Sequence, residues 1–114
     1  MATRGTIAAG IYPQRLRAVV DEVITPSEAA QRLIDLAIAN VKGSNHAEAC
    51  DAAKQAVDLL AREGSEAVLL ACTELPVALA EIELRQSLVV DATDALARAC
   101  VKASLGQYEP AKAG

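Results

Sequence analysis

The chain has 114 residues, which fits one domain, and 53% of them are hydrophobic, which excludes wholesale disorder. Only 2% are aromatic, so small aliphatic side chains must build the core. The net charge of −4, without a basic stripe, argues against nucleic-acid binding. The apolar runs are too short for a membrane span, and the N-terminus lacks a secretory segment. We therefore predict a cytoplasmic protein that binds neither nucleic acid nor membrane.

The first 25 residues predict a helix followed by a strand. Apolar residues repeat at helical spacing over residues 7–19, with Pro13 near the start of that helix. Residues 19–25, VVDEVIT, have the composition of a short strand.

Two longer helices follow. Thr25 and Glu28 form a capping box with Pro26 at the first helical position, and Gly43 ends the helix. Asn45 opens the next helix, which Gly64 ends. The expected inner face of the first helix is Ala30, Leu33, Ile34, Ala37 and Val41, and that of the second is Ala49, Ala52, Ala53, Ala56 and Leu60.

The last third of the chain predicts two buried strands and a helix. AVLLA, residues 67–71, is apolar throughout, as in a parallel sheet covered on both faces, and SLVV, residues 87–90, has the same character. The final helix ends near Gly106, with Ala95, Leu96, Ala99 and Ala103 expected to face inward. The order predicts a three-layer α/β/α domain over residues 1–106, with about three parallel strands and a frayed tail over residues 107–114.

The sequence Cys72-Thr73-Glu74 lies where ligands bind in such domains, between a strand end and a helix start. Free N–H groups there would stabilise a thiolate and lower the pKa of Cys72. Thr73 offers a hydroxyl, and Glu74 can orient the thiol or a substrate amine. The other interpretation, which residue chemistry alone favours, is a buried cysteine capping a strand. Cys50 and Cys100 are interpreted as small core residues.

The N-terminal stretch Thr3-Arg4-Gly5-Thr6 is a second candidate site. Backbone N–H groups there could cradle a carboxylate or phosphate, although taken alone the stretch favours a simple helix cap.

Four further polar residues are better explained by structural roles than by a role in a site. Asp91 and Asp94 are better explained as helix caps than as cleft residues, and Lys42 is a weak candidate for binding a substrate carboxylate. We place His46 on the surface, at the end of the fold away from Cys72. Three scattered cysteines and a single histidine predict neither a disulfide framework nor a metal site.

Three stretches, ATRGTIAAGIY, VLLACTELP and VVDATDA, in this order and spacing resemble the aspartate/glutamate racemase family, and specifically its second half. The resemblance implies a cofactor-independent enzyme in which two α/β domains present thiols to opposite faces of the substrate Cα. Carried over, Cys72 is the second-domain acid/base with Glu74 and Thr73 beside it. Thr3, Gly5 and Thr6 then hold the carboxylate of the amino-acid substrate.

The sequence departs from the family pattern in two ways. We expect the first domain, its thiol and the strand before Thr3 to be missing, and Leu96 stands where many relatives carry a histidine. We therefore expect a racemase-family domain that is incomplete alone and assembles as a homo-oligomer or with a separate first-domain chain. The alternatives are a noncatalytic remnant that acts as an oligomerising interaction module, and a flavodoxin-like domain that binds small anions.

Overall fold

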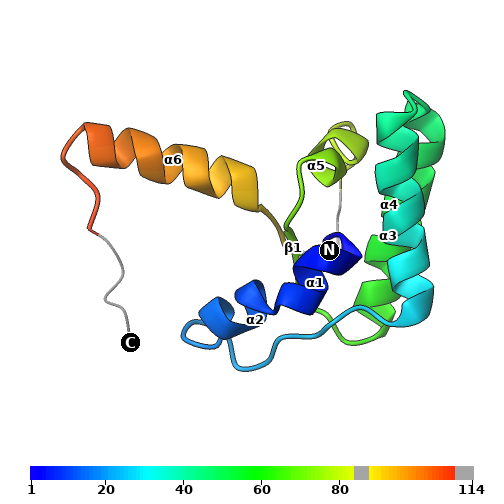
Figure 1. Ribbon diagram of the computed structural model, residues 1–114, viewed down its shortest axis with the longest axis horizontal. Helices are drawn as coiled ribbons and strands as arrows, with labels where there is room; N and C mark the ends of the chain where they lie inside the picture. Colours follow the sequence, from blue (N-terminus) through cyan, green and yellow to red (C-terminus); the bar gives the residue numbers. More distant parts are fainter. Residues whose placement is uncertain (84–87, 110–114) are drawn as a thin grey trace.

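The computed structural model describes residues 1–83 and 88–109, which form a mixed α/β domain (Figure 1). The elements in chain order are α1 (Arg4–Ala9), α2 (Ile11–Leu16), α3 (Glu28–Lys42), α4 (His46–Arg62), β1 (Ala67–Leu70), α5 (Glu74–Ala78), β2 (Leu88–Asp91) and α6 (Ala92–Ser104). The predicted α/β class with a short parallel sheet is confirmed. Within the described residues, no helix is both long and apolar enough to cross a membrane.

The sheet consists of two parallel strands in the described part of the chain, with Leu70 opposite Asp91. Met1 lies on the other side of β1. Its backbone nitrogen donates to the Leu69 carbonyl (2.6 Å), and its carbonyl accepts from the Ala71 N–H (2.9 Å). This is the hydrogen-bond pattern of a parallel pair, so one extended residue occupies the place of the third strand.

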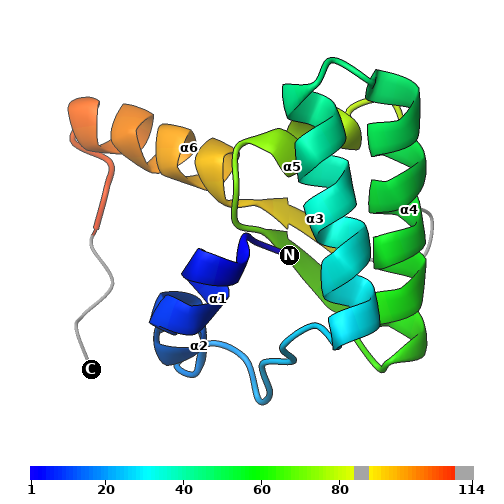
Figure 2. The same cartoon turned by 45° about the vertical axis from the view of Figure 1, so that its right-hand side comes forward.

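Helices α3 and α4 lie side by side against one face of the sheet (Figure 2). All five residues predicted for the inner face of α4 are buried, and Val57 joins them. The contact is rich in alanine, whose short side chains let two helices approach closely. The fully buried alanines of this pair are Ala30, Ala37, Ala49, Ala53 and Ala56.

The predicted helix over residues 7–19 is wrong in its bounds. Helix α1 begins at Arg4 and ends at Gly10, whose φ of 66° is left-handed, and α2 starts again at Ile11. Glycine adopts this conformation at little cost, so the chain turns there. Pro13 lies in the first turn of α2, where its missing N–H breaks no helical bond.

The predicted strand over residues 19–25 is also wrong. The segment has no regular structure, and Val19 is 76% exposed, since no described strand lies beside it to complete a ladder. The predicted capping box does not form either. Ser27 is the N-cap of α3 and accepts the Ala30 N–H, which leaves Thr25 and Pro26 outside the helix. Gly43 ends α3 as predicted.

Helix α6 forms where predicted, but its expected inward face is not covered. None of its residues, all of which are described, is buried, and Leu96 is 65% exposed. Strand β2 ends at Asp91 and α6 begins at Ala92, so no connecting residue allows the helix to fold back on the sheet. Helix α6 therefore projects from the body (Figure 1). Cys100 on this helix is exposed, which contradicts its predicted core role.

Candidate active site

The carboxyl edge of the sheet brings the two predicted motifs together. Met1 pairs beside Leu70, and Leu70 is opposite Asp91, so these three residues lie at one level. Thr3 follows Met1 by two residues, and Cys72 follows Leu70 by two residues. These side chains therefore leave adjacent segments at the same edge, which is where ligands bind in parallel sheets.

Cys72 lies between β1 and α5 and is partly buried against the hydrophobic core. Burial raises the pKa of its thiol, and the backbone N–H groups of Leu75 and Glu74 lower that pKa by a smaller amount. The negative charge of Glu74 and its hydrogen bond with the thiol raise the pKa further. The expectation of a lowered pKa was therefore wrong, because burial outweighs the N–H groups of the five-residue helix α5.

Two neighbouring side chains contact the Glu74 carboxylate. The Thr73 hydroxyl donates to its Oε2 (3.0 Å), and Lys42 Nζ lies 3.8 Å from its Oε1. The Thr73 hydrogen bond is the main cause that lowers the pKa of Glu74, and Lys42 and the Cys72 thiol lower it further. The charge of Glu74 in turn raises the pKa of Cys72, which favours the protonated thiol.

Lys42 has a larger place in the site than its sequence context suggested. Its ion pair with Glu74 brings the end of α3 next to α5. His46 begins α4 four residues later, so it lies at the same end of the helix pair as Cys72, contrary to prediction. Asp91 caps α6 by accepting the Thr93 N–H (2.8 Å), as expected.

Thr3, Gly5 and Thr6 lie at the start of α1. Thr3 is the N-cap, and its Oγ1 accepts the Thr6 N–H (3.2 Å) and lies 3.0 Å from the Thr6 hydroxyl. Gly5 is exposed, and a Cβ built on it would meet no described atom within 4 Å. The prediction that this stretch caps a helix is therefore confirmed for Thr3. The hydroxyls of Thr3 and Thr6 lie next to each other.

The sequence interpretation missed a polar network that links α3 to the Thr3 segment through the buried Gln31. Gln31 is 5% exposed, and its Nε2 donates to the Ala2 carbonyl (2.9 Å) and to Asp35 Oδ1 (2.9 Å). Arg4 donates to Asp35 Oδ2 (2.7 Å) and forms an ion pair with Glu28. A signal was present, since Gln31 precedes Ile34 by three residues and therefore lies on the inward stripe of α3.

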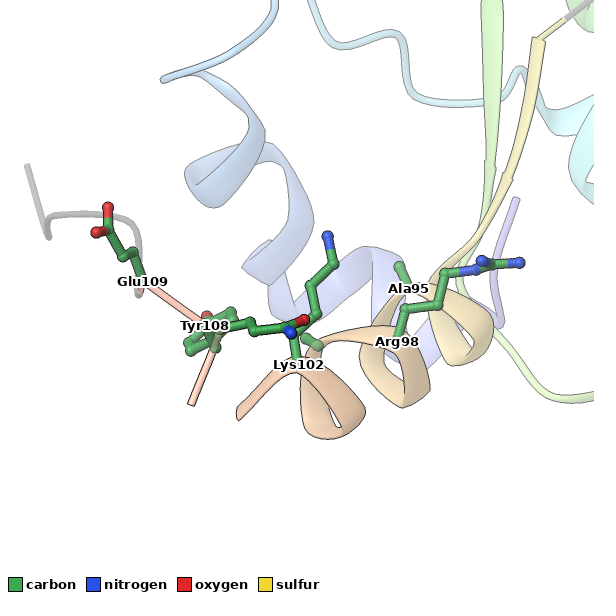
Figure 3. Close-up of a pocket in the computed structure, with 7 residues that line it drawn as sticks. Ala95, Arg98, Lys102, Tyr108 and Glu109 are labelled. Atoms are coloured by element: carbon green, nitrogen blue, oxygen red, sulfur yellow. The ribbon is translucent and has the colours of Figure 1, made fainter. Parts of the chain in front are cut away.

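A pocket on α6 is separate from this edge (Figure 3). Arg98 and Lys102 from the helix and Tyr108 and Glu109 beyond it line this open concavity, together with Ala95, Ala99 and Gln107. None of the predicted site residues is among these. Among the described residues, no group of three His, Cys, Asp or Glu side chains could hold a metal ion.

Comparison with known proteins identifies the family of this chain. The model of the Asp/Glu/hydantoin racemase family matches residues 1–100. The chain belongs to this family. It is also 35% identical over 104 residues to an uncharacterized protein encoded in the pnlA 3′ region of Pectobacterium carotovorum subsp. carotovorum, a match that covers 90% of this chain and 69% of that relative. No solved structure matches the chain. The family match places this α/β domain among the racemases, as the motifs predicted.

Proposed function

We propose that this racemase-family domain moves a proton at Cα of an amino acid of the aspartate/glutamate type, with Cys72 as acid/base and without a cofactor. One observation carries the proposal: Cys72 follows β1 at the carboxyl edge of the sheet, level with Thr3, and has beside it the Glu74 carboxylate, which Thr73 and Lys42 hold in place. Family membership supplies the reaction class.

In the proposed reaction, Cys72 delivers its proton to the carbanionic Cα and becomes a thiolate, and in the reverse direction the thiolate takes the Cα proton. Glu74 keeps the thiol protonated before delivery, and its charge makes the resulting thiolate a stronger base. Thr73 and Lys42 hold Glu74 in its ionised form. General acid/base groups of this kind act best when they are positioned within hydrogen-bond reach of the reacting atom.

The substrate carboxylate is proposed to bind the hydroxyls of Thr3 and Thr6. The two hydroxyl oxygens lie 3.0 Å apart, so one hydroxyl can donate to the other, and the hydroxyl that accepts this bond can donate its own proton to the ligand. Gly5 has no side chain and is exposed, which leaves the approach to both hydroxyls open.

One thiol serves one face of Cα, so inversion requires a donor on the opposite face. The other two cysteines do not follow a strand at the carboxyl edge of the sheet. Cys50 lies within α4, and Cys100 is eight residues past the start of α6, about 12 Å along the helix. We propose that a second copy or a separate first-domain chain supplies the second thiol. The exposed apolar side chains Leu96 and Val101 of α6, and Leu105 at its C-cap, favour such assembly. Light scattering coupled to size exclusion tests the first of these, and a stable monomer at micromolar concentration would contradict a second copy as the source of the thiol.

Substrate protection of Cys72 tests the site. Glutamate or aspartate is expected to slow alkylation at Cys72 and not at the exposed Cys100, as measured by peptide mapping. Thr6→Val should weaken this protection, because it removes a hydroxyl and keeps the shape of the side chain. Equal alkylation rates at Cys72 with and without either amino acid would contradict the proposed site.

A further inference from the structure

The segment that carries Thr3 is held from two sides. On the sheet side, Met1 exchanges two hydrogen bonds with β1. On the helix side, the Ala2 carbonyl accepts from Gln31 Nε2 at 2.9 Å, and Ala2 itself is 2% exposed. Thr3 follows directly as the N-cap of α1. The two anchors together fix the direction in which the chain leaves the sheet.

Helix α1 depends on these anchors because little packing holds it. None of its residues, all described, is buried. Its Arg4 side chain is tied to Asp35 and Glu28 on α3, but that ion-pair cluster is exposed and contributes little to its position. The buried Gln31 bond is therefore the stronger link between α3 and the start of α1.

We infer that Gln31 is a positioning residue, which fixes Ala2 against α3 and thereby sets where the Thr3 hydroxyl lies relative to Cys72. This inference rests on the proposed function of Thr3 and Cys72. It adds a residue that touches neither the substrate nor the thiol.

The hydrogen bonds of Gln31 favour positioning over a plain role in stability. Its Oε1 is buried and has no partner among the described residues, and a buried acceptor without a partner destabilises a fold. A methionine of similar length would fill the same space without this cost. Methionine lacks the hydrogen-bond donor that the Gln31 amide provides. Asp35 Oδ1 orients this amide so that its Nε2 also donates to the Ala2 carbonyl.

Gln31→Met tests the inference, with Gln55→Met as the matched control. Gln55 also donates to an aspartate four residues away, Asp51 (2.8 Å), but on the exposed side of α4. The first readout is hydrogen exchange at the Ala71 amide, which donates to the Met1 carbonyl. Gln31→Met should accelerate this exchange about five- to tenfold relative to the Ala53 amide in α4, as expected for one lost hydrogen bond. Gln55→Met should leave the ratio unchanged.

The second readout is Cα deuterium exchange of glutamate in deuterated water. Gln31→Met should raise KM about tenfold with kcat within about twofold, because carboxylate binding is displaced while the thiol is untouched. A purely structural role would lower the amount of active protein and leave KM unchanged. If the wild-type chain exchanges no Cα proton, the proposed function fails, and the Ala71 amide still decides the role of Gln31.

Two results would overturn the inference. One is an Ala71 exchange ratio that Gln31→Met does not change, and the other is an equal rise in Gln55→Met. If Gln31→Met does not fold, Asp35→Ala serves instead, since Asp35 Oδ1 orients the Gln31 amide and Asp35 is not buried. It should shift the Ala71 ratio in the same direction, and an unchanged ratio would reject the network.

Discussion

Leu75→Ala is expected to destabilise the domain strongly, because Leu75 joins the candidate site to the core. Its side chain is 0% exposed and belongs to the cluster formed by β1, α3 and α4. Truncating a fully buried leucine to alanine costs about 2–5 kcal/mol, from lost burial and the cavity left behind. Domains of this size are typically stable by about 5–15 kcal/mol, so the variant should lose a large part of its stability.

Val77→Ala is the matched control for this measurement, since Val77 lies on the same helix α5 and is 51% exposed. Urea unfolding followed by circular dichroism should show a change within about 0.5 kcal/mol for Val77→Ala. Equal stability losses in the two variants would refute the placement of α5 on the core.

Three further outcomes are expected. Ser27→Ala should cost about 1 kcal/mol in urea unfolding, because Ser27 caps α3, whereas Asn45→Ala should cost less, since Asn45 makes no side-chain cap bond to α4 within the described residues. Glu74→Gln should lower the pKa of Cys72, by removing a negative charge that raises it, so alkylation at pH 8 should become faster. Because folding raises the pKa of Cys72, the stability that its protonated thiol contributes is complete below the unfolded pKa of about 9 and is lost as pH rises through the folded pKa. Cys72→Ser should therefore lose less stability than the wild-type chain between these two pH values.

Local periodicity was enough to predict the helices that pack on each other. The spacing of Ala49, Ala53 and Ala56 identified the inner face of α4, because burial of a helix follows its 3.6-residue repeat. The same reasoning failed for α6. Its pattern predicts an apolar face, but nothing in the pattern says whether another element covers that face, and Leu96 remains exposed.

The remaining differences depend on contacts between distant parts of the chain. Residues 19–25 have strand composition, but a strand needs a neighbour, and none is present beside them in the described structure. Burial and the Glu74 carboxylate raise the pKa of Cys72, and two backbone N–H groups lower it. The sequence shows only which groups are near, not which effect is larger. The bond of Gln31 to Ala2, 29 positions away, could be suspected from its place among apolar residues but not assigned.

Cα deuterium exchange in deuterated water tests the central proposal, that Cys72 is the acid/base, most directly. Aspartate or glutamate incubated with the wild-type chain should gain deuterium at Cα. Where no partner supplies the second thiol, this exchange should be faster than racemisation, because one thiol serves one face. Cys72→Ser should abolish the exchange, and Cys50→Ser, which changes a cysteine on α4, should retain it. Exchange that survives in Cys72→Ser at the wild-type rate would contradict the account.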